Sequence, residues 1–119
     1  MDAEELKQYD WENPPTKQLP RHPLVQMAYF ASMGTEHQEQ FMNMVKSIKP
    51  GEVRFIENDF PYDVKEPIKH SCIWYNGTFT PDDVIEFLHT VKVEYITFFE
   101  NDAKFKSIPE VSHYHVFHY

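Results

Sequence analysis

The chain has 119 residues, of which 41% are hydrophobic and 16% aromatic, a composition that predicts one packed domain and excludes a largely disordered chain. Eleven lysines and arginines against 19 aspartates and glutamates give a formal net charge of −8, which disfavours generic binding to nucleic acid backbones. Cys72 is the only cysteine, and no apolar run reaches the roughly 18 residues of a membrane span or the core of a signal peptide. We therefore expect an intracellular, soluble protein in a reducing compartment.

Residues 1–23 are polar and interrupted by prolines, which predicts an N-terminal arm followed by a single domain over residues 24–119. Within the arm, the segment from Asp2 to Tyr9 suits a short helix. Trp11 and Leu19 are expected to fix the arm to the body of the domain.

Two helices are predicted next, over residues 24–33 and 36–48. Pro23 suits a first helical position and Gly34 a helix end, and Thr35 with Gln38 has the spacing of a capping box. The apolar residues of the second helix recur at helical spacing and predict one buried stripe: Phe41, Met44, Val45 and Ile48.

Beyond Gly51 the pattern becomes one of short strands, expected over residues 53–57, 68–75, 94–99 and 112–118. Between the second and third of these, Thr80 and Pro81 begin a helix over residues 81–92, with a buried stripe of Val84, Phe87, Leu88 and Val91. A longer helix as far as Glu100 fits the same stripe. The predicted fold class is α+β, an antiparallel sheet of about four strands with about three helices packed on it.

Histidines are concentrated in the last predicted strand. Side chains alternate between the faces of a strand, so His113 and His115 share a face with Phe117, whereas His118 lies on the other face. His70, Cys72 and Trp74 form a similar alternating set on residues 68–75. If the two strands are neighbours, the two sets converge.

Four interpretations of this cluster stay open. A neutral histidine can attack phosphorus while a second histidine relays a proton. His70, His113 and His115, with Cys72, can hold a transition metal, but the final strand has no acidic residue, so no metal ligand is assigned. A histidine cluster can also be a pH switch, or merely a hydrogen-bonded part of an aromatic core. Tyr62 and Trp74 can stack on a base or sugar, or belong to the core.

A resemblance follows from two stretches: Phe60-Pro61-Tyr62 with Ile68 to Trp74, and Lys106 to Phe117 with its His-x-His-Val-Phe ending. Together they resemble the largely fungal N-acetylglucosamine-induced protein family, a family of uncharacterised biochemistry. This resemblance covers about residues 60–118 and implies no specific activity.

The ending is more distantly similar to the histidine triad superfamily, in which an Asn-ended strand, a serine loop and a strand of alternating histidines build a nucleotide-phosphate site. This similarity implies a histidine-triad-like fold and phosphate contacts from Asn101 and Ser107. Val111 or Phe117 stands where a third histidine belongs. If Val111 takes the place of the missing histidine, the similarity implies His113 as the nucleophile. If Phe117 takes that place, it implies His115.

The leading hypothesis is a domain that binds a nucleotide or sugar phosphate and hydrolyses or transfers its phosphoryl group. His113 and His115 would supply the nucleophile and the proton relay, and His70 would orient them. The alternative is a non-catalytic interaction or assembly subunit, viral or complex-bound, that uses aromatic edges and the arm from Trp11 to Pro23 to bind a protein partner or a second copy. The sequence identifies no cofactor.

Overall fold

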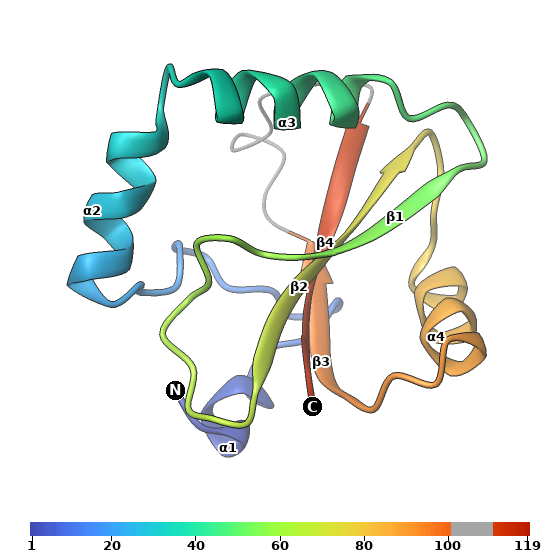
Figure 1. Ribbon diagram of the computed structural model, residues 1–119. Coiled ribbons are helices and arrows are strands. Elements are labelled where there is room, and N and C mark those ends of the chain that lie inside the picture. The colour runs from blue at the N-terminus through green and yellow to red at the C-terminus, as the bar shows by residue number, and fades with distance from the viewer. Residues whose placement is uncertain (101–110) are drawn as a thin grey trace.

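The computed structural model describes residues 1–100 and 111–119, which form four helices and one four-stranded antiparallel sheet (Figure 1). The strand order is β1-β2-β4-β3, so the last strand lies inside the sheet. These elements confirm the α+β class. In chain order they are α1 (Ala3–Leu6), α2 (Pro23–Ser32), α3 (Glu36–Lys46), β1 (Val53–Glu57), β2 (Lys69–Asn76), α4 (Pro81–Thr90), β3 (Tyr95–Glu100) and β4 (Val111–His118).

The ends of α4 follow from its sequence. The hydroxyl of Thr80 accepts the backbone N–H of Asp83, and the Asp83 carboxylate accepts that of Thr80, a complete capping box. At the other end Lys92 has a φ of 59°, which turns the chain out of the helix. A strand therefore follows, as predicted, in place of a longer helix. Val91 lies beyond the helix and is 43% exposed, so its predicted place in the buried stripe is wrong.

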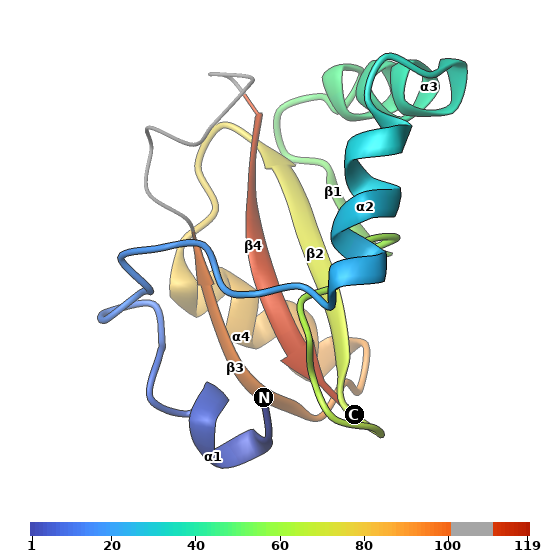
Figure 2. The same cartoon turned by 90° about the vertical axis from the view of Figure 1, so that its left-hand side faces the viewer.

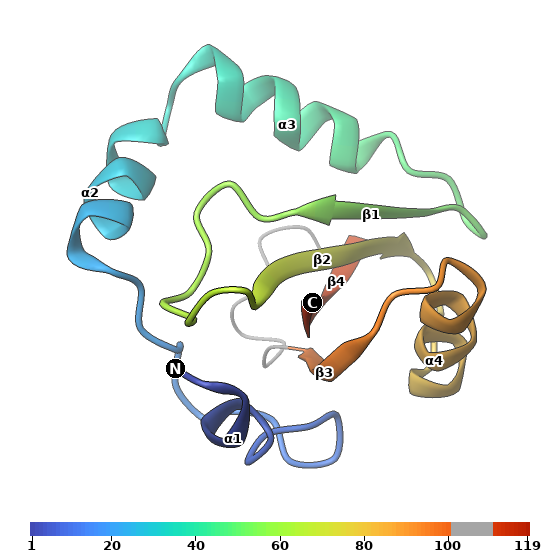
Figure 3. The same ribbon diagram turned by 60° about the horizontal axis from the view of Figure 1, so that its bottom comes forward.

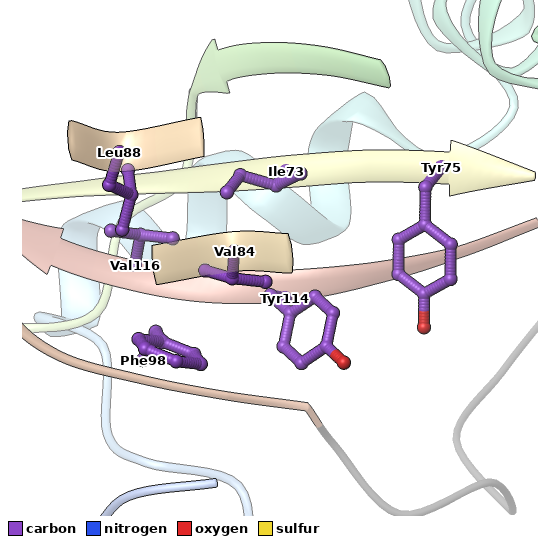
Figure 4. Packing of buried hydrophobic residues seen from close by; sticks show 7 residues of the cluster. All are labelled: Ile73, Tyr75, Val84, Leu88, Phe98, Tyr114 and Val116. Atoms are coloured by element: carbon purple, nitrogen blue, oxygen red, sulfur yellow. The ribbon is translucent and has the colours of Figure 1, made fainter. Parts of the chain in front are cut away.

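Helix α4 covers one face of the sheet (Figure 4). Its fully buried side chains, Val84 and Leu88, pack onto apolar side chains from three strands. The strand residues of this cluster are Ile73 and Tyr75 of β2, Phe98 of β3, and Tyr114 and Val116 of β4.

The opposite face is covered by the N-terminal arm and by the loop before β2. Figure 2 shows the arm crossing in front of the sheet, with α4 behind it. Leu6 is fully buried and Leu19 is 8% exposed, and both belong to a cluster with Phe99 and Phe117. The expectation is therefore confirmed for Leu19 but wrong for Trp11, which is 46% exposed, and Leu6 anchors the arm together with Leu19. The division into arm and domain stays a prediction.

Helices α2 and α3 lie on the β1 side of the sheet (Figure 3). No residue of α2 is buried, and α3 buries Val45. The expectation that about three helices pack on the sheet is therefore wrong for α2, whose apolar side chains Leu24, Met27 and Phe30 are exposed. Within the described ranges, no helix combines the length and apolar character that crossing a membrane requires.

Candidate functional site

The pairing of β2 with β4 brings the two histidine-bearing segments together. Trp74 lies opposite His113, Cys72 opposite His115, and His70 opposite Phe117. Paired residues share a face of the sheet, so all six side chains lie on the face away from α4. The predicted convergence of the two strands is confirmed. His118 lies on the other face, where its Nε2 is 2.8 Å from the Ser71 hydroxyl.

His70 and His115 form a buried pair. Their exposed fractions are 1% and 3%, and Nε2 of His70 lies 2.8 Å from Nδ1 of His115. The backbone N–H of Tyr62 donates to the other ring nitrogen of His70 over 3.1 Å. The rings of Tyr62 and Phe117 lie 4.6 and 4.7 Å from the His70 ring, centroid to centroid, and fix its orientation.

Burial controls the protonation of these groups. It lowers the pKa of His70 to about 3, with the charge of Arg21 acting in the same direction. Burial likewise lowers the pKa of His115 well below its ordinary value, and His113, His70 and Arg21 contribute. Burial therefore favours the neutral form of both rings at neutral pH, which argues against the pH-switch interpretation for this pair.

Cys72 completes a cluster of metal-binding atom types with the histidine pair. Its sulfur lies 3.9 Å from Nδ1 of His115, and the ligand atoms of Cys72, His70 and His115 lie within 4.8 Å of one another. Burial raises the pKa of the Cys72 thiol to about 12, so the sulfur is protonated at neutral pH. A metal would have to displace that proton as well as the hydrogen bond between the histidines.

His113 and Trp74 lie at the more accessible end of the same face. The rings stack with centroids 4.2 Å apart, and Phe41 of α3 approaches Trp74 edge-on at 5.7 Å. Both His113 and Trp74 are partly exposed, in contrast to the His70–His115 pair. They form one wall of a cavity.

That cavity has a volume of about 620 Å³ and lies between the sheet, α2, α3 and the loop after β1. Its lining includes aromatic, histidine and polar side chains from the arm, α2, α3, the loop after β1, β2 and β4. Among them are Arg21, Tyr29, Phe41, Asn58, Tyr62, Cys72, Trp74, His113 and His115.

Arg21 is held between two aromatic rings of this cavity. The central carbon of its guanidinium group lies 4.5 Å from the Tyr29 ring centroid and 5.2 Å from that of Tyr62. Its Nε donates to the carbonyl of Phe60 over 2.8 Å. Its Nη1 atom is buried and has no hydrogen-bond partner among the described residues.

The structure thus brings together five of the seven predicted site residues: His70, His113, His115, Trp74 and Tyr62. Asn101 and Ser107 lie outside the described residues. Sequence reasoning gave no site role to Arg21. The available signal was that Arg21 is one of only two arginines in an acidic chain and directly precedes the His22-Pro23 start of α2.

The chain belongs to a family described as "Protein of unknown function (DUF3605)", whose model matches residues 5–119. No curated protein matches it. A solved structure described as "Crystal Structure of HTC1" is similar, with a TM-score of 0.54 and 15% sequence identity over 85% of this chain and 76% of that chain. At this identity the likeness concerns the fold alone.

Proposed function

We propose that this DUF3605 domain binds a small phosphorylated ligand, a nucleotide or a sugar phosphate, in the cavity beside β2 and β4. The observation that carries the proposal is the buried Nη1 of Arg21, which has no hydrogen-bond partner in the part of the chain that the structure describes. The aromatic wall of Trp74 and His113 supports it.

Arg21 has the properties of an anion receptor. Leaving a buried donor without a partner costs about 1–3 kcal/mol, a cost that a bound anion would remove. The two tyrosine rings and the Phe60 carbonyl already restrict the guanidinium group, so little entropy is lost when a ligand binds. A planar guanidinium matches the oxygen spacing of phosphate or carboxylate.

The rest of the cavity suits the organic part of such a ligand. The rings of Trp74, His113 and Phe41 offer apolar faces and edges to a base or a sugar. Asn58, Glu57 and Asp59 also line the cavity and can accept hydrogen bonds from hydroxyl groups. The carboxylates of Glu57 and Asp59 offset the positive charges of Arg21 and Lys17 in the cavity lining, which favours a ligand with one phosphate over a polyphosphate.

Histidine-dependent hydrolysis or phosphoryl transfer is part of the same proposal. His113 and His115 line the cavity, and His70 contacts His115. This part of the proposal includes the resemblance to the N-acetylglucosamine-induced proteins and the more distant one to the histidine triad superfamily. The latter implies phosphate contacts from Asn101 and Ser107. The binding proposal does not depend on them.

The test is a binding panel of adenosine monophosphate, glucose 6-phosphate, inorganic phosphate, adenosine and glucose. A ligand at 100 times its Kd adds about 2.7 kcal/mol to the free energy of unfolding, which a thermal shift detects. We expect one of the two phosphorylated compounds to stabilise the protein and its unphosphorylated counterpart not to do so. A panel without any shift contradicts the proposal.

The matched variants are Arg21→Gln and Arg54→Gln. Losing a charge-assisted hydrogen bond of about 1.5–3 kcal/mol weakens binding roughly 10- to 150-fold, which calorimetry measures directly. Arg54 is the other arginine and lies exposed on β1 beside Glu52, so its variant should bind normally. Equal affinity of Arg21→Gln and wild type would show that Arg21 does not bind the ligand.

A second candidate function, protein interaction, is favoured by α2. Its side chains Leu24, Met27 and Phe30 are 69%, 66% and 61% exposed, and apolar patches of this kind mark interaction sites. Sedimentation velocity on wild type and on Phe30→Ser discriminates this function. Protein interaction would be favoured if the mass of the wild type, but not that of Phe30→Ser, rises with concentration and if no compound of the binding panel stabilises the protein.

A further inference from the structure

Two hydrogen bonds in series link the backbone to the strand histidines. The Tyr62 amide donates to Nδ1 of His70 over 3.1 Å, and Nε2 of His70 lies 2.8 Å from Nδ1 of His115. A backbone N–H can only donate, so Nδ1 of His70 accepts and carries no proton.

The position of the remaining protons follows. A neutral imidazole has one N–H group, and that of His70 is therefore on Nε2. Nε2 of His70 then donates to Nδ1 of His115, which must accept. The single proton of a neutral His115 ring is consequently on its own Nε2.

The surroundings of the pair disfavour a charged ring. Both side chains are almost fully buried. Among the described residues, Arg21 from the arm and His113 and His118 from β4 lower the pKa values of the pair, and the neighbouring Cys72 thiol is uncharged at neutral pH. Arg21 is positive, and the two histidines can only become positive. An imidazolium in this position would be both poorly solvated and repelled.

We propose that His70 is a positioning residue that fixes His115 as a neutral Nε2–H imidazole. His115 can then offer a ligand only an N–H donor at Nε2 and no ring lone pair. The part of the inference that concerns the ligand rests on the proposed function, whereas the part that concerns the tautomer does not.

This assignment decides which chemistry His115 performs. A nucleophilic histidine needs a ring nitrogen with an available lone pair, but Nδ1 of His115 accepts from His70 and Nε2 is protonated. Whatever atom lies against that Nε2, from protein or ligand, must be an acceptor. A phosphate oxygen meets this condition, whereas a metal cation or a protonated amine does not.

The same chain of hydrogen bonds opposes a metal at the cluster with Cys72. To bind a metal through Nε2, His70 would have to move its proton to Nδ1. That N–H would then face the N–H of Tyr62, and the amide would lose its acceptor.

The experiment is long-range ¹H–¹⁵N correlation NMR on ligand-free protein labelled with ¹⁵N-histidine, which distinguishes the two neutral tautomers and the imidazolium. For His70 and His115 we expect a protonated Nε2 and an unprotonated Nδ1, unchanged between pH 8 and 5. An Nδ1–H tautomer or an imidazolium at either ring in this range would overturn the inference. A shift of both rings with one equivalent of Zn²⁺ would do so too.

Two substitutions test the positioning role. Gln at position 70 keeps a donor near the place of Nε2, whereas Asn keeps an acceptor near the place of Nδ1 but removes the donor. His115 should keep its tautomer in His70→Gln and populate both tautomers in His70→Asn. His89→Gln, at the exposed end of α4, is the control and should leave His115 unchanged.

An unchanged His115 in His70→Asn would refute the positioning role. If that variant does not fold, the wild-type spectrum still decides the tautomer. The spectrum is recorded without ligand. A binding panel without any thermal shift therefore contradicts the proposed function but not the tautomer assignment. An Nδ1–H tautomer contradicts the assignment but not the proposed function.

Discussion

Lowering the pH from 7 to 5 should destabilise the protein through its buried histidine His70. In the unfolded chain this ring has its ordinary pKa of 6.5, whereas in the folded protein burial lowers its pKa to about 3. The unfolded state therefore binds more protons between these two values. The stability contribution is fully present above about pH 6.5 and is lost progressively as the pH falls towards 3.

The size of this effect follows from the difference between the two pKa values. Each pH unit below 6.5 costs roughly 1.4 kcal/mol while the folded ring stays neutral, so His70 alone removes about 2 kcal/mol at pH 5. His115 acts in the same direction because burial lowers its pKa as well. For a domain with a free energy of unfolding of about 5–15 kcal/mol, such a loss is readily measured.

The assay is urea denaturation at pH 7, 6 and 5, a window above the range in which most of the 19 carboxylates become protonated. His70→Gln removes the titrating ring, so its free energy of unfolding should start lower at pH 7 but decline less steeply. His89→Gln removes an exposed histidine and should keep the wild-type slope. A wild-type stability that is constant from pH 7 to 5, or a His70→Gln slope equal to that of wild type, would refute this reasoning.

Three further predictions concern packing and capping. Leu88→Ala should cost about 2–5 kcal/mol in urea denaturation because the Leu88 side chain is fully buried between α4 and the sheet. Ile85 of the same helix is 39% exposed, so Ile85→Ala should cost less than about 1 kcal/mol. Leu6→Ala should cost a similar 2–5 kcal/mol and increase proteolysis of the arm, and an unchanged cleavage rate would contradict its anchoring role. Thr80→Ala should cost about 1 kcal/mol because the capping box of α4 loses its hydroxyl, while Thr80→Ser should restore most of it.

Local patterns in the sequence determined the kind and the extent of most elements. The cap and proline at Thr80-Pro81 place the start of α4 correctly, and Thr35 does the same for α3, because capping depends on residues within one turn. Strict alternation placed His113 and His115 on one face and His118 on the other, because the pleat of a strand has a period of two.

The tertiary structure decided the site. His70 and His115 are 45 positions apart, and only the insertion of β4 between β2 and β3 sets the register that puts their nitrogens 2.8 Å apart. Arg21 reaches the cavity because the arm crosses the sheet, which no local pattern near Arg21 encodes. The sequence did not reveal the exposure of α2 either, because the burial of a helix depends on which distant segments pack against it. Period and capping are properties of neighbouring residues, whereas register, burial and protonation are properties of contacts between distant ones.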